Sequence, residues 1–413
     1  AGILYSALQK EEYSAIYRFS ARMEREVDPT ALQRTIDRCM PRFPSFAVRI
    51  RKGLFWYYLE PNHAPGPFLK EDVSDPCQPA RFREANAWLV RFFYYRGRIS
   101  VEVVHALSDG GGAIVFFRTL LAEDLREAGV DVPAGNGVLD LNEPPREEEL
   151  EDSFLRYAGQ VPASRREATA YHLSGTPEPD GFLHLTTLMV PAAAMKETAK
   201  RHGVTVTELL CAAMMKAILN LQAEKVPNRR HRRPVKVLVP VNLRGIFPSS
   251  TLRNFAQYIT PEADPKMGDF TLEELCRLVH HRMGLEVGPK QMSARIATNV
   301  NSERSPVLKI MPLFIKNIAM KAVFDAVGEC KACLCLSNLG AVQLPQEMRP
   351  FIRRMDFIIG VQARAPHNCG VITYGDTVYI NMIRNIREPE LERHFYEVLH
   401  RLGLPVRAES NQP

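Results

Sequence analysis

His105, Asp109 and Gly110 have the residue types and spacing for acid–base chemistry, in the pattern H-x-x-x-D-G. A neutral imidazole can take up a proton near pH 7, so His105 is a candidate general base. Asp109, four positions further on, could orient the imidazole ring or hold the turn. In the alternative interpretation, His105 is a buried histidine at the end of a strand and Asp109 is the N-cap of a helix.

The residues around this motif predict a strand, a tight turn and a helix. Apolar residues at positions 99, 101 and 103 alternate with polar ones, which is typical of a half-buried strand. Glycines occupy 110–112, and 113–121 is an apolar run that indicates a helix. We therefore expect His105 at the end of the strand, held rigidly, with small neighbours that leave room for a substrate.

The length of 413 residues indicates two domains of about 200 residues each. Proline and glycine become frequent between 131 and 180, where an acidic run also occurs at 147–152. This composition predicts an N-terminal lobe over 1–140 that carries the motif, a linker over 141–180 and a C-terminal lobe over 181–413. We expect the acidic run to be exposed to solvent.

Both lobes show alternating strand and helix patterns, which predicts an α/β (α+β) protein with a mixed sheet and helices in each lobe. The expected strands are 14–23, 46–50, 54–59, 88–95, 98–104, 184–190, 235–241, 333–336, 357–361, 371–374 and 378–383. The expected helices begin at Asp28, Ala113, Pro191, Val206, Thr271 and Glu388.

Composition and charge exclude several classes of protein. The net charge of +6 is modest and spread along the chain, which argues against a nucleic-acid partner. The sequence contains no run of about 18 apolar residues, so it predicts no membrane span, and its first residues lack the features of a signal peptide. We therefore expect a cytoplasmic protein. The eight scattered cysteines are expected to be reduced thiols, and Cys333 and Cys335 fit a strand better than a metal site.

Residues 104–112 resemble the motif of an acyltransferase superfamily that includes chloramphenicol acetyltransferase, alcohol acetyltransferases and nonribosomal peptide condensation domains. Upstream, 31–49 resembles the helix and strand that precede the motif in that superfamily. Downstream, 240–245 and 253–255 resemble the segment in which the second half returns to the active site. The resemblance covers nearly the whole chain.

This resemblance implies two chloramphenicol acetyltransferase-like lobes with an active-site tunnel between them. His105 would deprotonate an acceptor that attacks a thioester. Asp109 and Gly110 would be structural, and Arg244 is the candidate ion-pair partner of Asp109; otherwise it is a surface arginine after a strand. Ser337 and Asn338 resemble a Ser-Asn-x-Gly turn near the tunnel, where they would donate a hydrogen bond to an oxyanion, or they form a plain turn.

The expected function is acyl transfer from acyl-CoA to an alcohol, with the coenzyme A thioester as co-substrate and no tightly bound cofactor or metal. A G-x-S-x-G nucleophile motif is absent. One alternative is a free-standing condensation enzyme that takes its donor from an acyl carrier protein and forms an amide or ester in natural-product biosynthesis. Another is a non-catalytic member of the fold that binds a ligand or partner. Two lobes in one chain can complete the site, so we expect a monomer.

Overall fold

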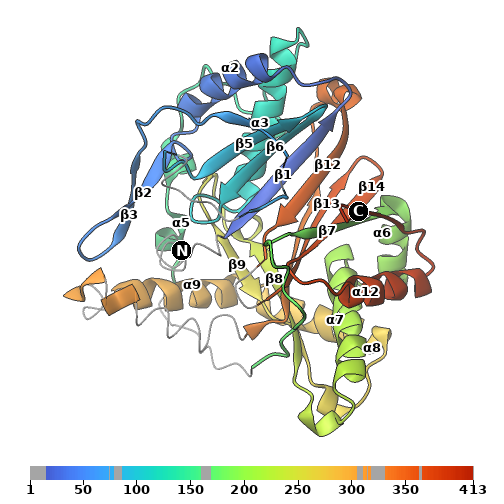
Figure 1. Ribbon diagram of the computed structural model, residues 1–413. Helices are drawn as coiled ribbons and strands as arrows, with labels where there is room; N and C mark the ends of the chain where they lie inside the picture. Colours follow the sequence, from blue (N-terminus) through green and yellow to red (C-terminus); the bar gives the residue numbers. More distant parts are fainter. Residues whose placement is uncertain are drawn as a thin grey trace.

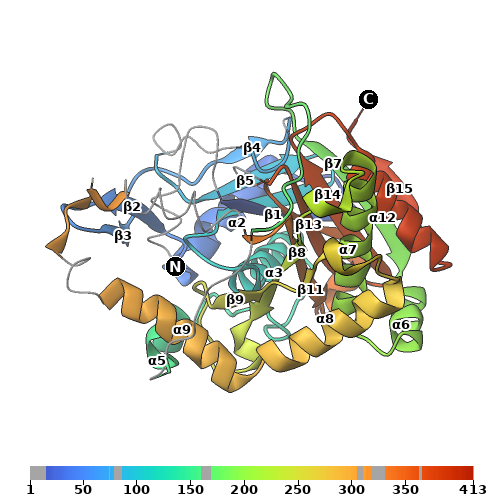
Figure 2. The ribbon, with the colours of Figure 1, turned by 90° about the horizontal axis from the view of Figure 1, so that it is seen from below.

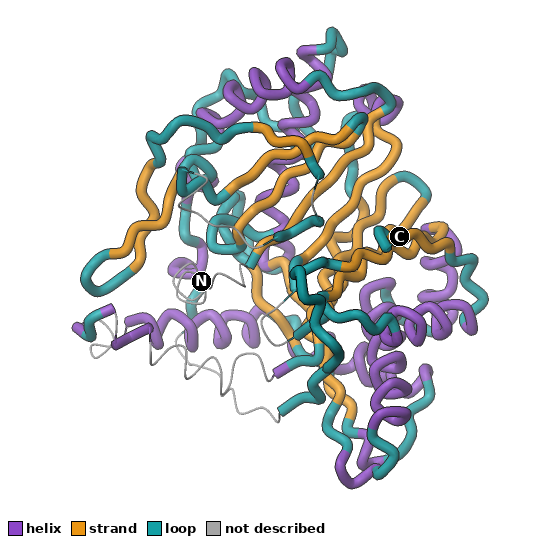
Figure 3. Tube along the Cα trace, viewed as in Figure 1, coloured by secondary structure: helices purple, strands orange, loops and turns teal. Residues whose placement is uncertain are grey.

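Two β-sheets, each with helices on its outer face, form two lobes in the computed structural model (Figure 1). The structure describes residues 15–73, 75–78, 86–159, 169–304, 310–313, 315–317, 331–361 and 365–412. Strands gather in the middle of the molecule and most helices lie at its periphery (Figure 3). The predicted α/β class, with a mixed sheet and helices in each lobe, is confirmed.

The N-terminal sheet has five strands in the order β12-β1-β6-β5-β4. β1 pairs antiparallel with β6, and Phe19 lies opposite Val101. Helices α2 and α3 belong to this lobe, and β2 and β3 form a separate hairpin. The bounds are β1 Ile16–Met23, α2 Pro29–Cys39, β2 Val48–Lys52, β3 Tyr57–Pro61, β4 Leu69–Glu71, β5 Val90–Tyr95, β6 Arg98–Val104, α3 Gly110–Glu127 and β12 Ile352–Ile359.

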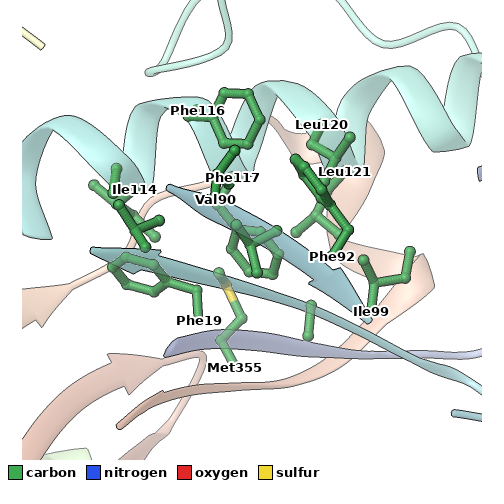
Figure 4. Close-up of a cluster of buried hydrophobic side chains, with 14 of the residues drawn as sticks. Phe19, Val90, Phe92, Ile99, Ile114, Phe116, Phe117, Leu120, Leu121 and Met355 are labelled. Atoms are coloured by element: carbon green, nitrogen blue, oxygen red, sulfur yellow. The ribbon is translucent and has the colours of Figure 1, made fainter. Parts of the chain in front are cut away.

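Helix α3 anchors the motif because its apolar side packs across the N-terminal sheet. Phe116 and Phe117 are completely buried. Phe117 stacks on Phe19 of β1, and Phe116 lies against Phe92 of β5 (Figure 4). Aromatic side chains of this size contribute most of the burial in a core, so the start of α3 is held firmly against the sheet.

The C-terminal sheet has eight strands in the order β10-β8-β11-β13-β14-β7-β15, with β9 paired to β8. β8, β11 and β13 run parallel to one another, and the remaining pairs are antiparallel. The strand bounds are β7 His184–Pro191, β8 Val235–Asn242, β9 Ala256–Ile259, β10 Glu262–Ala263, β11 Leu334–Ala341, β13 His367–Tyr374, β14 Thr377–Arg384 and β15 Arg407–Ser410. The helix bounds are α6 Ala192–Arg201, α7 Val206–Lys225, α8 Leu272–Glu286, α9 Pro289–Arg304 and α12 Glu390–Arg401.

Short 3-10 helices join several of these elements. They are η1 Met40–Arg42, η2 Arg229–His231, η3 Leu243–Gly245, η4 Pro265–Met267 and η7 Gln346–Phe351. Capping agrees with the sequence at two helices: Asp28 caps α2, and Thr205 with Glu208 forms a capping box on α7.

Strand β12 belongs to the sheet of the N-terminal lobe, although the predicted boundaries assign its residues to the C-terminal lobe. It comes from the segment assigned to the C-terminal lobe, yet it pairs with β1 along most of its length, with one irregularity at Met23. Local patterning cannot show this because a strand's partner is set by tertiary packing. The C-terminal half of the chain therefore contributes one strand to the N-terminal sheet, which ties the two lobes together beside the motif.

The acidic run in the predicted linker is only partly exposed. It contains one short helix, α4 Glu147–Leu150, and a second, α5 Ser153–Arg156, follows it. Glu149 is buried and makes a two-pronged ion pair with Arg42, at 2.6 and 3.0 Å. The expectation of a wholly solvated run is wrong at Glu149, because a carboxylate that accepts from a guanidinium in two places can be buried.

Among the described residues, α7 is the one helix long and apolar enough to cross a membrane. Most of it is buried inside the C-terminal lobe, where Leu209, Met214 and Ile218 belong to the core. It packs between α8, α12 and β8. These contacts identify α7 as the central core helix of that lobe.

Candidate active site

The motif loop joins the end of β6 to the start of α3, as the sequence predicts. His105 is the first residue after β6 and is half-buried. Its backbone N–H donates to the carbonyl of Ala15 at 2.7 Å, and its ring contacts the ring of Tyr17 edge-on at 5.4 Å. The Tyr17 hydroxyl donates to the carbonyl of Ser108 at 2.9 Å. β1 therefore supports the loop on one side.

Asp109 is both a helix cap and an ion-pair partner. Its carboxylate accepts from the backbone N–H of Gly112 at 2.9 Å and from that of Phe255 at 2.5 Å. Arg244 Nη1 lies 2.9 Å from both carboxylate oxygens. Asp109 is 4% exposed, and two of its partners come from the C-terminal lobe. The carboxylate thus fastens the second half of the chain to the motif loop.

Arg244 is held in place by the segment that follows it. Its side chain is 15% exposed, which does not fit a surface arginine. Nε donates to the carbonyl of Thr251 at 2.8 Å, and Nη2 donates to that of Arg253 at 2.6 Å. With Asp109 these acceptors use most of the donors of the guanidinium fork, so Arg244 has a structural position.

Residues 251–255 form a return segment that lies directly on the motif loop. Ser108 Oγ donates to the carbonyl of Leu252 at 2.6 Å. A Cβ atom on Gly112 would stand 2.1 Å from that same carbonyl oxygen. Glycine at position 112 is therefore required for the return segment to lie this close to the motif loop.

Replacing Gly112 with alanine should destabilise the protein by about 1–3 kcal/mol, the usual cost of overpacking, because Leu252 must move away from the loop. Thermal unfolding of the wild type and the variant measures the effect. Gly284→Ala is the matched control, since a Cβ atom there meets nothing within 4 Å and α8 should gain helix propensity. Equal unfolding temperatures for Gly112→Ala and wild type would contradict the close approach.

Asn254 contacts the candidate base directly, and sequence reasoning did not single it out. Its side-chain nitrogen lies 3.0 Å from His105 Nδ1 and 3.1 Å from the carbonyl oxygen of His105. The one sign of Asn254 in the sequence is that residues 253–255 resemble the segment that returns to the active site in the acyltransferase superfamily. Asn254 is a positioning residue that fixes one edge of the imidazole.

The pKa of His105 is lowered from its usual value of 6.5, mainly because burial disfavours the charged imidazolium. A hydrogen bond to its own backbone and the negative charge of Asp109 act in the opposite direction. The imidazole is therefore neutral near pH 7 and available to accept a proton.

Ser337 and Asn338 lie inside β11 rather than in a turn after it. The register with β13 is irregular between Asn338 and Ala341, where Gly340 has a positive φ of 73°. Asn338 donates to Thr207 Oγ1 at 3.0 Å and accepts from Gly340 N–H. These partners give Asn338 a local structural role, since the bulge uses both ends of its amide.

Gly110, the first residue of α3, faces β11. A Cβ atom there would lie 2.8 Å from Leu339 Cδ2. The motif loop is thus enclosed by β1, by β11 and by the return segment. Among the described residues, no group of His, Cys, Asp and Glu is arranged to hold a metal ion.

The sequence matches no protein-family model and no curated protein. Solved structures do match. TRI101 from F. sporotrichioides, complexed with coenzyme A and T-2, has 11% identity and a TM-score of 0.62 over 99% of this chain and 98% of that one. The first condensation domain of the CDA synthetase has 13% identity and a TM-score of 0.56 over 97% and 93%.

A third match is the wax ester synthase/diacylglycerol acyltransferase from Marinobacter aquaeolei VT8, with 12% identity and a TM-score of 0.55 over 97% and 98%. The chain has the condensation-domain-like acyltransferase fold. The resemblance expected from the sequence is thereby confirmed at the level of the fold. The chain also spans 40% of the nonribosomal peptide synthetase FmoA3, so this fold occurs both alone and within larger chains.

Proposed function

We propose that the protein is an acyltransferase that moves an acyl group from a thioester to an alcohol, with His105 as general base. The observation that carries the proposal is the position of His105 at the junction of the two lobes, where Asn254 of the return segment contacts its ring and its carbonyl oxygen. The fold shared with acyltransferases supports the reaction class.

In this reaction the neutral His105 ring carries its own proton on Nδ1, which bonds to the backbone of the same residue, and Nε2 takes the proton of the acceptor hydroxyl. The acceptor oxygen then attacks the thioester carbonyl carbon and forms a C–O bond. Collapse of the tetrahedral intermediate breaks the C–S bond. The proton on His105 passes to the departing thiolate, which leaves as the free thiol and restores the neutral base.

The other polar groups of the motif loop are committed elsewhere. The Ser108 hydroxyl donates to the Leu252 carbonyl, and the Asp109 carboxylate already accepts from Arg244 and two backbone N–H groups. Neither residue is therefore placed to act as a nucleophile. This supports direct transfer without an acyl-enzyme intermediate.

Coenzyme A is the donor carrier that we propose, since TRI101 of the same fold was crystallised with it. The second candidate is a carrier-protein-bound donor, which the condensation-domain match favours. A basic run of Arg229, Arg230, Arg232, Arg233 and Lys236 follows the C-terminus of α7, and part of its charge is already paired. Arg229 pairs with Asp269, and the buried Lys236 pairs with Glu262.

The test is release of free thiol from acetyl-, butyryl- and longer acyl-CoA with a panel of alcohols and amines. Acceptor-dependent release by the wild type, lost in His105→Ala, is the expected result. Release only from acyl carrier protein thioesters, followed by mass spectrometry, would establish the second candidate. Binding of thioester without turnover from either donor would overturn the catalytic proposal and leave a binding protein.

The pH dependence of kcat/KM should reveal the pKa of His105 and the effect of Asn254 on that pKa. Because the His105 pKa is lowered, kcat/KM should stay level above neutral pH and fall only as the pH drops through an apparent pKa below 6.5. Asn254→Asp places a carboxylate beside Nδ1 and stabilises the imidazolium, so the acid limb should move to higher pH.

Asn254→Ala removes the contact without adding charge, so kcat should fall about tenfold. The acid limb of its kcat/KM profile should lie at lower pH than the acid limb of Asn254→Asp. Loss of stability alone would lower activity at every pH and leave the limb in place. An Asn254→Asp profile identical to the wild-type profile would show that the side chain does not hold the base.

A further inference from the structure

The β2–β3 hairpin carries an exposed apolar tip that the proposed reaction does not use. Leu54, Phe55 and Tyr58 are exposed at its end, and Leu54 is 74% exposed. Ile310 and Ile315 are exposed on the described residues 310–313 and 315–317, which follow α9 in the chain, and Ile310 is 76% exposed. We call these five side chains the apolar tip.

Hydrogen bonds and a cation–π contact join the two parts of the apolar tip into one surface. The N–H of Leu313 donates to the carbonyl of Leu54 at 2.9 Å. Lys316 Nζ donates to the carbonyl of Phe55 at 2.7 Å and lies 3.3 Å from the centre of the Trp56 ring. Asn317 Nδ2 donates to the Tyr57 hydroxyl at 2.9 Å.

These same contacts occupy the backbone acceptors at the end of the hairpin. The carbonyls of Leu54 and Phe55 are bound by Leu313 and Lys316, and the carbonyl of Trp56 accepts from Gly53 N–H. A segment that leaves water must have such groups satisfied internally, because an unpaired carbonyl is costly in an apolar medium. The apolar tip meets this requirement at these three positions.

Charge around the apolar tip is positive. Residues 48–61 contain the cations Arg49, Arg51 and Lys52 and the single carboxylate Glu60, whereas Lys316 is buried against the hairpin. Both Arg49 and Arg51 bind Glu60, while Lys52 is exposed. Aromatic and aliphatic side chains beside lysine and arginine are typical of surfaces that lie in the interface of an anionic bilayer.

The apolar tip lies at an extremity of the molecule rather than in a groove. Figures 1 and 2, related by a 90° turn, both show the hairpin projecting at one end. A projecting tip can enter a bilayer interface, whereas two projecting tips bury little area against each other. We propose that the apolar tip docks the protein on anionic membrane surfaces.

Vesicle sedimentation of the full chain tests this proposal. The wild type should bind vesicles that contain phosphatidylglycerol and should bind phosphatidylcholine vesicles more weakly. Binding should also weaken as salt rises, because screening reduces the attraction to anionic lipid. The double variant Leu54→Ser/Ile310→Ser should lose about tenfold or more in partitioning, since it removes two aliphatic anchors.

A matched control replaces Met267, which is 83% exposed in η4 of the C-terminal lobe. Met267→Ser should bind like the wild type. Trp56 is a direct reporter in a Trp88→Phe background, where its emission should shift to the blue on binding to vesicles. Lys52→Glu should lower binding to phosphatidylglycerol vesicles more than Lys200→Glu, since Lys200 lies on α6 of the other lobe.

Three results would overturn the proposal: no binding of the wild type to phosphatidylglycerol vesicles at low salt, equal binding by the double variant, or equal loss in Met267→Ser. A wild-type dimer that Leu54→Ser converts to a monomer would identify the tip as a contact between copies instead. Membrane docking does not depend on acyl transfer, so His105→Ala should bind vesicles like the wild type.

Discussion

Replacing His105 with alanine should lower kcat by about 100-fold or more and leave the fold intact. The imidazole is the only group of the motif loop that we assign to proton transfer, and loss of a general base costs roughly 10²–10⁴ in rate. The contacts that hold the loop together belong to Ser108, Asp109 and the backbone rather than to the ring, so the fold should persist. The measurement is steady-state thiol release beside circular dichroism.

The matched control for His105→Ala is Asn254→Ala, which removes a contact of the ring but keeps the base. Its kcat should lie between those of the wild type and His105→Ala, while KM should change little in either variant. A His105→Ala enzyme with wild-type kcat would disprove the base assignment. Thiol release without an acceptor, unchanged in His105→Ala, would show only background hydrolysis of the thioester.

Replacing Asp109 with alanine should damage both stability and activity. The change leaves Arg244 without its carboxylate partner in a largely buried position and removes the acceptor of two backbone N–H groups. Breaking a buried pair from one side costs about 3–5 kcal/mol. Urea unfolding should show this loss, and activity should fall because the return segment that carries Asn254 is no longer fastened.

Asp109→Asn separates the two duties of this side chain, since an amide oxygen can still cap α3 but carries no charge. It should be less destabilising than Asp109→Ala. A double-mutant cycle with Arg244→Met then isolates the ion pair, and a coupling of about 0.5–3 kcal/mol is expected for residues in contact. Asp109→Ala with wild-type stability and wild-type activity is the outcome that contradicts a structural role.

These predictions depend on how the second half returns to the motif. Arg244, Leu252, Asn254 and Phe255 all reach the loop from the C-terminal lobe. Arg244 and Phe255 both bind the Asp109 carboxylate, Leu252 accepts from Ser108, and Asn254 contacts His105. A change at one contact should therefore disturb its neighbours, because Arg244 itself binds the carbonyls of the return segment that carries the other three. Non-additive effects are expected among them and not with distant positions such as Gly284.

The sequence predicted the structure best where each feature is determined by residues a few positions apart. The alternation over β6, the glycines of the motif and the capping residues Asp28 and Thr205 each act within a few positions, so they can be read directly from the chain. The pairing of Arg244 with Asp109 was reached only through a resemblance, since 135 positions separate the two residues and no local pattern links them.

The sequence by itself determined that this is a two-lobed α/β protein with His105 at the end of a strand, because hydrophobic period and turn chemistry are properties of short segments. Only the tertiary structure decided that β12 crosses to the other sheet, that Glu149 is buried on Arg42, that Asn338 closes a bulge and that Asn254 holds the base. Each of these depends on which surfaces meet when the two lobes pack, and a chain read one segment at a time does not contain that information.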